Sequence, residues 1–392
     1  MSASRIAAVE TFIVSLPRDT PYLGPLSEGE QVNARGYLVR QGNRTIYPST
    51  DMSVLIKVTA ESGAVGWGET YGIVAPDAVT AMIDDVLGPV IVGRDPRDAT
   101  AINEDLYNLM RVRGASGGFW GDAIAGIDIA LWDLAGKLVG LPVAKLLGGQ
   151  RTARVPVYVS GLPGRTLADK VALARDFAAR GFTAFKYAAA VSCDGIVDEM
   201  RALREALGPR VKLMVDLHWK FDAGEAIQLI DRLVPFDPYF VEAPCAAEDI
   251  EGQARVAATA RVPVALGEEW RSVHEALPRF ERRAMSIVQP EMGHTGVSQF
   301  MQIGRMAHAF HMRVIPHASI GVGIFQAASL HASASLPNVT MHEYQHSVFD
   351  RNLQFVTTTM RCENGAFSLP QGAGLGIQPR PDVWQFLRSK SA

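Results

Sequence analysis

Cysteine is scarce in this sequence, and its few residues do not form a metal-binding pattern. The three cysteines, Cys193, Cys245 and Cys362, lie far apart, so they lack the paired spacing of a zinc site. An odd number leaves at least one thiol unpaired, which favours a reducing compartment. The N-terminal sequence MSASRIAAVETFIV has no basic segment followed by an apolar one, so it does not resemble a secretion signal. These absences predict a cytoplasmic protein.

Long apolar runs and blocks of like charge are also missing. No stretch approaches the roughly 18 uninterrupted apolar residues of a membrane span. The net charge is −3 and no basic block occurs, so neither a membrane nor a nucleic acid is expected as a partner. The chain has 392 residues, of which 48% are hydrophobic and 20% charged. This describes a well-buried globular protein, long enough for a barrel of about 250 residues plus a second domain.

The first part of the chain has the pattern of a small α+β domain. Residues 6–16 and 51–60 alternate like antiparallel strands, and 63–70 supply a third strand after a glycine turn. Helical patterns follow around 76–90 and 97–111. Between the first two strands, residues 17–50 form a polar stretch long enough to suggest a functional loop. Its candidates for contact with a polar substrate are Arg18, Tyr22, Arg35, Arg44 and Tyr47.

From about residue 126 a single unit repeats, consisting of a short apolar strand, a loop and an amphipathic helix. Eight such strands, mostly 22–30 residues apart, predict an α/β fold of the (β/α)₈ TIM-barrel type with an N-terminal α+β capping domain. An open doubly wound sheet is the alternative, but GAGLG at 372–376 lacks the dinucleotide spacing. The expected domains are residues 1–125 (cap), 126–362 (barrel) and 363–392 (a return to the cap). The predicted strands are 155–160, 182–188, 212–218, 239–244, 263–269, 286–291, 312–317 and 339–345.

Ionisable residues end seven of these eight strands, at the edge where barrels carry their active sites. Asp216, Glu242 and Glu268 recur at intervals of 26 residues, which places one carboxylate on each of three neighbouring strands. An all-oxygen ligand set of this kind favours Mg²⁺, with Mn²⁺ as a substitute, over Zn²⁺. The alternative is that each carboxylate caps the following helix or pairs with a lysine.

Several motifs together resemble the enolase superfamily, in its mandelate racemase-like subgroup. They are IDIALWDLAGKLVGLPVAKLLGG (127–149), VDLH, VEAP, GEEW, VQPE and IPHASIG. The resemblance covers nearly the whole chain. It implies that Asp216, Glu242 and Glu268 bind Mg²⁺, and that the enzyme removes the proton α to a substrate carboxylate to give an enediolate.

The resemblance also implies a catalytic base. His317 ends strand seven, where the subgroup carries its histidine, and the partner position at the end of strand six is Glu291 instead of the usual Asp. Glutamate can still bond an imidazole nitrogen and fix its tautomer, although its side chain has a different reach. The alternative for His317 is a core histidine that bonds to the backbone.

Strand two departs further from the subgroup, which commonly carries Lys-x-Lys there. This chain has Lys186 but Ala188 at the second position, so simple racemisation is disfavoured. Lys186 is then a counter-ion for the substrate carboxylate, an acid/base group, or a structural cation. In the dehydratases of the subgroup, the histidine of Asp-x-His is a general acid, a role that falls here on His218. The alternative is that His218 holds water or bonds Glu242.

Glu343 ends strand eight, where the subgroup places a protonated carboxylic acid that donates to the enediolate. The function expected from these residues is Mg²⁺-dependent dehydration of a hydroxylated carboxylic acid to a 2-keto-3-deoxy acid. The substrate would be an aldonic or aldaric acid sugar or a small dihydroxy diacid. The alternatives are a racemase, epimerase or lactone cycloisomerase of the same subgroup, or an inactive carboxylate-binding member. Exposed apolar helix faces predict a homo-oligomer.

Overall fold

The computed structural model describes residues 4–318 and 321–390, which leaves Ser319 and Ile320 of the IPHASIG motif outside the described residues. All eight predicted barrel strands form within these ranges, and successive strands pair in parallel. The last strand pairs in parallel with the first, and a bridge between Val314 and Val339 closes the ring. The predicted barrel is therefore confirmed. The strands are β6 (Arg154–Ser160), β7 (Ala184–Ala188), β8 (Lys212–Asp216), β9 (Phe240–Glu242), β10 (Val264–Leu266), β11 (Ile287–Val288), β12 (Arg313–Val314) and β13 (His342–Tyr344).

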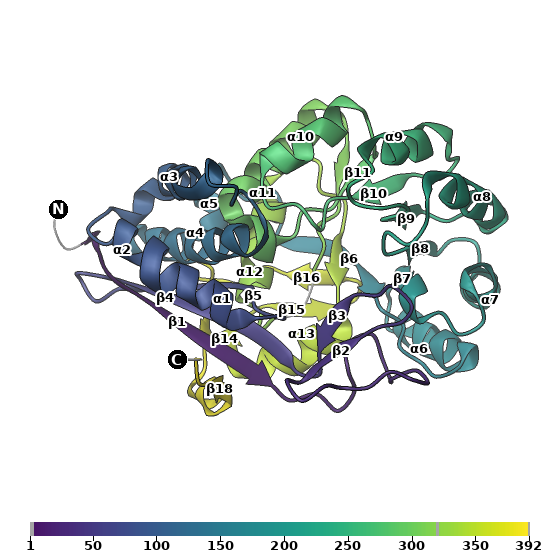
Figure 1. Ribbon diagram of the computed structural model, residues 1–392, viewed down its shortest axis with the longest axis horizontal. Helices are drawn as coiled ribbons and strands as arrows, with labels where there is room; N and C mark the ends of the chain where they lie inside the picture. Colours follow the sequence, from purple (N-terminus) through teal and green to yellow (C-terminus); the bar gives the residue numbers. More distant parts are fainter. Residues whose placement is uncertain (1–3, 319–320, 391–392) are drawn as a thin grey trace.

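Helices connect these strands and cover the outside of the barrel, where they follow one another around its rim (Figure 1). Local sequence fixes several starts: Thr166 with Asp169 and Asp222 with Glu225 form reciprocal capping boxes. The helices are α6 (Leu167–Ala179), α7 (Ile196–Leu207), α8 (Ala223–Leu233), α9 (Ile250–Thr259), α10 (Val273–Glu281), α11 (Met292–Ala309) and α12 (Ile324–Ser335), with short 3₁₀ turns η4 (Ala189–Val191) and η5 (Val234–Phe236).

One apolar layer fills the barrel interior, with a residue from each of the eight strand segments. Its members range from 0% to 3% exposed, so this layer is a solid floor and not a channel. The layer consists of Tyr158, Ala184, Met214, Phe240, Ala265, Ile287, Ile315 and Met341.

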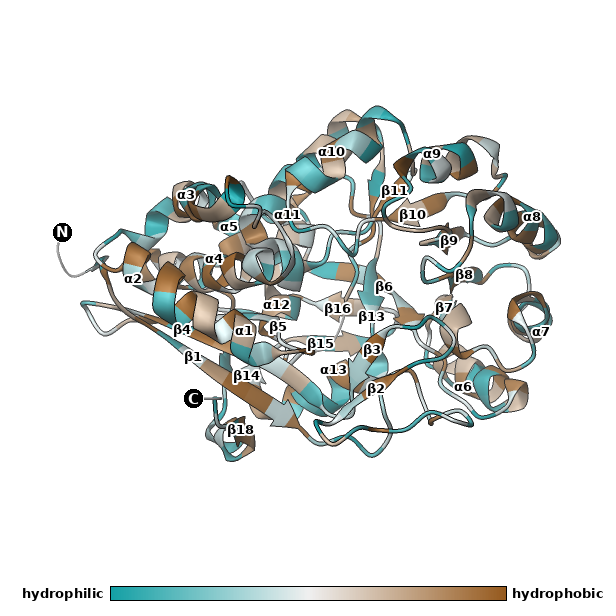
Figure 2. Cartoon of the chain, in the orientation of Figure 1, coloured by the Kyte–Doolittle hydropathy of each residue, from teal (hydrophilic) through white to brown (hydrophobic). Residues whose placement is uncertain are grey.

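The capping domain is an antiparallel sheet covered by helices on one face. Hydrophobic residues run along β1 and α4, whereas α10 on the barrel carries many hydrophilic residues (Figure 2). The long helix α4 lies so close to β5 that a Cβ at Gly68 would come within 2.0 Å of the Gly126 carbonyl oxygen. The elements are β1 (Ile6–Leu16), β4 (Asp51–Ala60), β5 (Val65–Tyr71), α1 (Pro76–Ala81), η2 (Met82–Leu87), α2 (Gly88–Ile91), η3 (Pro96–Asp98), α3 (Ala99–Arg111), α4 (Gly118–Val139) and α5 (Val143–Leu146).

The long segment 17–50 contains a small hairpin, and the C-terminal part of the chain runs back across the molecule. Strand β18 pairs with β1 of the cap sheet, and β16 pairs with β6 of the barrel. The chain end thus ties the two domains together. The remaining elements are β2 (Tyr37–Val39), β3 (Ile46–Pro48), α13 (His346–Asn352), η6 (Leu353–Phe355), β14 (Val356–Thr358), β15 (Arg361–Glu363), β16 (Ala366–Ser368), β17 (Ile377–Pro379), η7 (Pro381–Phe386) and β18 (Leu387–Arg388).

A buried carboxylate fixes the cap to the barrel. Glu69, at the end of β5, is 0% exposed and accepts hydrogen bonds from Ser53 and from the backbone N–H groups of Val322, Ile324 and Phe325. These amides lie just before and in the first turn of α12, where a negative charge is favourable. The orientation of the cap over the strand ends is therefore set by specific bonds.

The structure also agrees with the scarcity of cysteine and of long apolar runs in the sequence. All three cysteines are unpaired. Among the described residues, no helix has both the length and the apolar character that crossing a bilayer requires.

Candidate active site

A polar layer lies directly above the apolar floor of the barrel. Side chains alternate along a strand, so the residue two positions after each floor residue points to the same interior. This rule gives seven polar side chains and one glycine, all at the carboxyl ends of the strands. They are Ser160, Lys186, Asp216, Glu242, Gly267, Gln289, His317 and Glu343.

Lys186 is a buried cation held by carboxylates from two strands. Its Nζ lies 2.7 and 2.8 Å from the two carboxylate oxygens of Glu242 and 3.1 Å from Glu343 Oε1. Burial lowers the pKa of Lys186, but Glu242 and Glu343 raise it more, so the pKa lies well above its usual range. Lys186 therefore stays protonated in this arrangement.

His218 reaches the cavity by a different route from the one its spacing suggests. The predicted strand 212–218 ends at Asp216, and His218 and Trp219 both have a φ of +52°. A strand over 212–218 would place Asp216 and His218 on one face, but the chain has already turned at His218, so they do not share one. The turn forms when the His218 N–H donates to Asp216 Oδ1 at 2.9 Å, and the ring Nε2 then lies 3.1 Å from Asp216 Oδ2.

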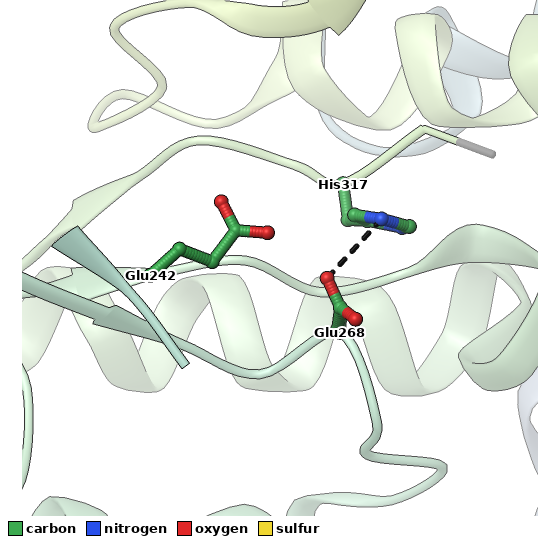
Figure 3. Close-up of side chains that lie close together, drawn as sticks. All are labelled: Glu242, Glu268 and His317. Atoms are coloured by element: carbon green, nitrogen blue, oxygen red, sulfur yellow. Dashed lines mark ion pairs between the residues drawn. The ribbon is translucent and has the colours of Figure 1, made fainter. Parts of the chain in front are cut away.

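His317 lies among three glutamates. Its Nδ1 bonds Glu291 Oε2 at 2.6 Å, and the backbones of the two residues form a parallel bridge. Its Nε2 lies 3.2 Å from Glu268 Oε2 (Figure 3). The same nitrogen lies 3.6 Å from Glu343 Oε2. Burial lowers the pKa of His317, but Glu268, Glu343 and Glu291 raise it well above its usual range. The imidazole is thus oriented by the Glu291 side chain and is not a core histidine bonded to backbone.

Glu343 differs from the protonated acid that the resemblance implies. Burial raises its pKa, but Lys186 and His317 lower it more, which leaves a pKa of about 2. Its Oε2 accepts a hydrogen bond from the Ala318 N–H at 3.0 Å. In this arrangement Glu343 is an ionised acceptor, because Lys186 and His317 both lie beside its carboxylate.

The donor set fits a divalent cation. Ligand atoms of Glu242, Glu268 and His317 all lie within 4.8 Å of one another (Figure 3). Glu268 Oε2 is buried and accepts no well-aligned hydrogen bond from a described residue, and burial raises the pKa of this carboxyl well above its usual range. Asp216 does not belong to this compact group, because its carboxylate is bonded to His218. Buried carboxylates without donors are costly, and a bound cation would remove that cost.

The site opens into a cavity of about 410 Å³ between the strand ends and the cap. Lys186, His218 and His317 line the side of the cavity that borders the strand ends. The cap contributes a mostly apolar roof, which includes Tyr22, Leu23, Ile46, Tyr47, Tyr71, Ile73 and Val74.

The loop candidates therefore divide. Tyr22 and Tyr47 line the cavity as predicted, but none of the three arginines does. Arg18 forms an ion pair with the buried Asp51 at 2.5 Å, and Arg35 and Arg44 are exposed. Two of the five candidates thus line the cavity, and the arginines do not, because the loop's charges are neutralised internally or lie in solvent.

Sequence reasoning missed several residues of the site. Gln289 donates to Glu242 Oε2 at 2.8 Å, and Ser160 hydrogen-bonds Glu343. Strand periodicity identifies both, since each lies two residues after a floor residue. Asp122, Arg271 and His294 also line the cavity, and Asp122 bonds both of the others. No strand pattern marks these three, which come from α4, α11 and the loop after β10.

Known proteins share this architecture along most of the chain. Residues 45–148 match the N-terminal domain of the mandelate racemase / muconate lactonizing enzyme family, and residues 169–383 match the enolase C-terminal domain-like family. The D-galactarolactone cycloisomerase of Agrobacterium fabrum is 32% identical, over 84% of this chain and 89% of its own length. A D-galactonate dehydratase of Ralstonia nicotianae is 33% identical, over 85% and 90%.

Solved structures extend the likeness. A proposed isomerase from Sinorhizobium meliloti is 55% identical, with a TM-score of 0.97 over 98% of this chain and 99% of that chain. A racemase from Streptomyces coelicolor with bound magnesium is 25% identical, with a TM-score of 0.84 over 98% and 100%. This chain therefore belongs to the enolase superfamily, in the mandelate racemase-like subgroup, and is an enzyme of the lyase or isomerase type.

Proposed function

We propose that this enzyme dehydrates a hydroxylated carboxylic acid to a 2-keto-3-deoxy acid in a Mg²⁺-dependent reaction, with His317 as the base. The observation that carries the proposal is the imidazole fixed by Glu291 at 2.6 Å, with its other nitrogen facing a cluster of carboxylates and the cavity. A base must be oriented within reach of the proton that it removes, and this pair provides the orientation.

Asp216, Glu242 and Glu268 are proposed as the residues that hold Mg²⁺. They offer only carboxylate oxygens, which this hard cation prefers, and Glu268 already has an oxygen without a well-aligned donor. His317 lies in the compact group through its contact with Glu268, but as a base it needs Nε2 for the substrate. When bound, the cation supplies positive charge to the substrate carboxylate, which makes the α-proton more acidic.

Three further polar residues, Lys186, His218 and Glu343, are assigned separate roles. Lys186, held as a cation by Glu242 and Glu343, is proposed to offset the charge of the substrate carboxylate. His218 lines the cavity and is proposed to donate a proton to the departing β-hydroxyl. Glu343 is proposed to hold Lys186 and His317 in place.

Racemisation is less favoured by this geometry. A racemase needs a base on each side of the α-carbon, and the candidate opposite His317 is Lys186. The ordinary pKa of a lysine is already about 10.4, and Glu242 and Glu343 raise that of Lys186 further, so this residue is a poorer base than an imidazole, whose ordinary pKa is about 6.5. One base combined with one acid suits an elimination.

Cycloisomerisation is the second candidate, and the 32% identical D-galactarolactone cycloisomerase favours it. Like dehydration, such a reaction can begin with loss of the α-proton and departure of a β-oxygen. The difference is that a ring oxygen stays attached to the product, whereas a hydroxyl leaves as water.

A screen of acid sugars and their lactones tests the proposal. Each compound is incubated with the enzyme and Mg²⁺ in D₂O, and both α-proton loss and keto-acid formation are followed. Release of a 2-keto-3-deoxy acid supports dehydration, and a keto product formed only from lactones supports cycloisomerisation. Exchange without any keto product would overturn both in favour of epimerisation, and no exchange with any compound would overturn His317 as a base. Omission of Mg²⁺ with added EDTA is expected to stop the reaction.

A further inference from the structure

Three side chains form a second polar cluster in the cavity, separate from the polar layer at the strand ends. Asp122 lies in the first turns of α4, Arg271 follows β10, and His294 begins α11. Asp122 Oδ1 accepts Arg271 Nε at 3.1 Å and lies 2.6 Å from His294 Nδ1. All three line the cavity, and their side chains are 4%, 21% and 16% exposed. One buried carboxylate thus anchors two donors at once.

The anchoring leaves the outer donor of each side chain available. Arg271 Nη1 donates to the Glu269 carbonyl at 2.6 Å, but Nη2 bonds to no described residue. His294 likewise uses Nδ1 for Asp122, and its Nε2 has no partner among the described residues. A guanidinium N–H is a good donor to a carboxylate, and the ring of His294 is anchored on the same carboxylate, Asp122, as Arg271.

Close packing against Gly121 fixes the position of the Arg271 side chain. A Cβ at Gly121 would lie 2.6 Å from Arg271 Cγ, so only glycine lets the arginine stem cross the start of α4. On the other side, Tyr71 stacks on the His294 ring with centroids 4.2 Å apart. Tyr71 also hydrogen-bonds Glu291, the partner of His317. The second cluster therefore lies next to the proposed reaction centre, across a single tyrosine.

The donors of the cluster suit one carboxylate. Nη2 of Arg271 bonds to no described residue, and the guanidinium pairs with a single carboxylate, that of Asp122. In the polar layer, Lys186 is assigned to the carboxylate next to the α-carbon, and none of the loop arginines lines the cavity. Among the described cavity residues, Arg271 and His294 are thus the groups suited to a second anion.

We propose that the substrate is a dicarboxylic acid sugar, an aldaric acid or its monolactone, whose distal carboxylate binds Arg271 and His294. The carboxylate next to the α-carbon lies at the polar layer, and the hydroxylated carbons span the cavity between the two. This inference rests on the proposed function only in its choice of a hydroxylated carboxylic acid as the ligand.

Paired ligands test the inference by binding. For each stereochemical series, a hexaric acid and the corresponding hexonic acid differ only at C6, and calorimetric titration with Mg²⁺ present gives both dissociation constants. At least one hexaric acid should bind about tenfold or more tightly than its hexonic partner, as a charge-assisted contact predicts. If no hexaric acid binds more tightly than its partner, the inference is overturned.

Variants locate the preference. Arg271→Gln should bring the ratio of the two dissociation constants close to one, and His294→Gln should reduce it in the same direction. Arg282→Gln is the matched control, because Arg282 is 43% exposed and pairs on the surface with Glu251. The control should keep the wild-type ratio. Thermal unfolding confirms that each variant folds, and His294→Gln serves alone if Arg271→Gln does not. A ratio that survives in the cluster variants would contradict the inference.

The same experiment separates this inference from the proposed function. Loss of the α-proton is measured on the same ligands in D₂O. If the enzyme prefers diacids in a way that depends on Arg271 but shows no proton exchange and no keto acid, the proposed carboxylate site is supported and dehydration is overturned. If keto acid forms but both acids bind equally well, dehydration is supported and the proposed carboxylate site is overturned.

Discussion

At the scale of single residues, each histidine of the site is defined by the carboxylate that holds it. His317 is bonded to Glu291, His218 to Asp216 and His294 to Asp122. In His317 and His294 the bonded Nδ1 fixes the ring orientation and leaves Nε2 for chemistry, whereas His218 contacts Asp216 through both ring nitrogens. Three imidazoles in one cavity can therefore have three different roles.

His218→Asn tests the division between base and acid. Because His218 is proposed to act after the α-proton has left, the variant should slow keto-acid formation by about 100-fold or more, the usual contribution of a general acid. Exchange of the α-proton should fall much less. Both rates are measured on one substrate in D₂O, and an equal loss of both would place His218 in metal or substrate binding instead.

Sequence periodicity predicts most of the polar layer and fails where the backbone leaves the strand. Lys186, Asp216, Glu242 and His317 follow the alternation of their strands. Strand β10 instead reaches Gly267, with a φ of +128°, and Glu268 faces the cavity one residue later. His218 departs in the same way. A left-handed residue at a strand end changes which side chain points inward, and alternation alone does not reveal it.

At the scale of elements, the cap loop shows why its chemistry could not be read from composition. Segment 17–50 is rich in arginine, yet Arg40 is 1% exposed and donates to the carbonyl oxygens of Tyr22, Gly24 and Pro25. It also pairs with Glu30 at 2.7 Å. The arginine holds the loop together and leaves tyrosine and isoleucine to face the substrate. Composition identified a functional loop but not which side chains it presents.

The contact between Glu69 and α12 is the element-scale bond that a mutation can remove. Glu69→Ala leaves the buried amides of Val322 and Ile324 without their acceptor. We expect a loss of about 2–4 kcal/mol in the free energy of unfolding, as for other broken buried networks. Chemical denaturation measures it. Glu10→Ala is the control, because Glu10 is half exposed and pairs on the cap surface with Lys57. A Glu69→Ala cost as small as that of the control would contradict the assignment.

At the scale of the whole molecule, the domains are tied by the return of the C-terminal segment. His331 on α12 accepts the Ala144 N–H at Nδ1 and donates from Nε2 to the Leu375 carbonyl. The ring must be neutral to do both. Burial accordingly lowers its pKa to about 4. The junction of barrel, α5 and C-terminal segment thus depends on one uncharged histidine.

This junction predicts a pH dependence of stability. The folded-state pKa of His331 is depressed, so its contribution is complete above the unfolded pKa of about 6.5 and is lost as the pH falls toward 4. The destabilisation caused by His331→Asn should therefore shrink by about 1.4 kcal/mol per pH unit across this window. Denaturation of both proteins at several pH values checks it. A destabilisation that stays constant or grows toward pH 4 would contradict the neutral-ring assignment.

The fold and the family were predictable because the strand–helix repeat and the strand-end carboxylates are regular in sequence. The second polar cluster was not, since Asp122, Arg271 and His294 come from three elements that only the tertiary fold brings together. Pairwise bonds across 149 and 172 residues of sequence leave no local signal. The polar layer at the strand ends can be predicted from the sequence, whereas the second polar cluster can be found only in the structure.

Loss of the substrate α-proton in D₂O, followed by ¹H NMR for the wild type and His317→Asn with Mg²⁺ present, is the direct test of His317 as the base. The variant should fold, as measured by circular dichroism. It should lose the α-proton at least about 100-fold more slowly than the wild type, because the oriented base is gone. Exchange in His317→Asn at a rate close to that of the wild type would contradict it.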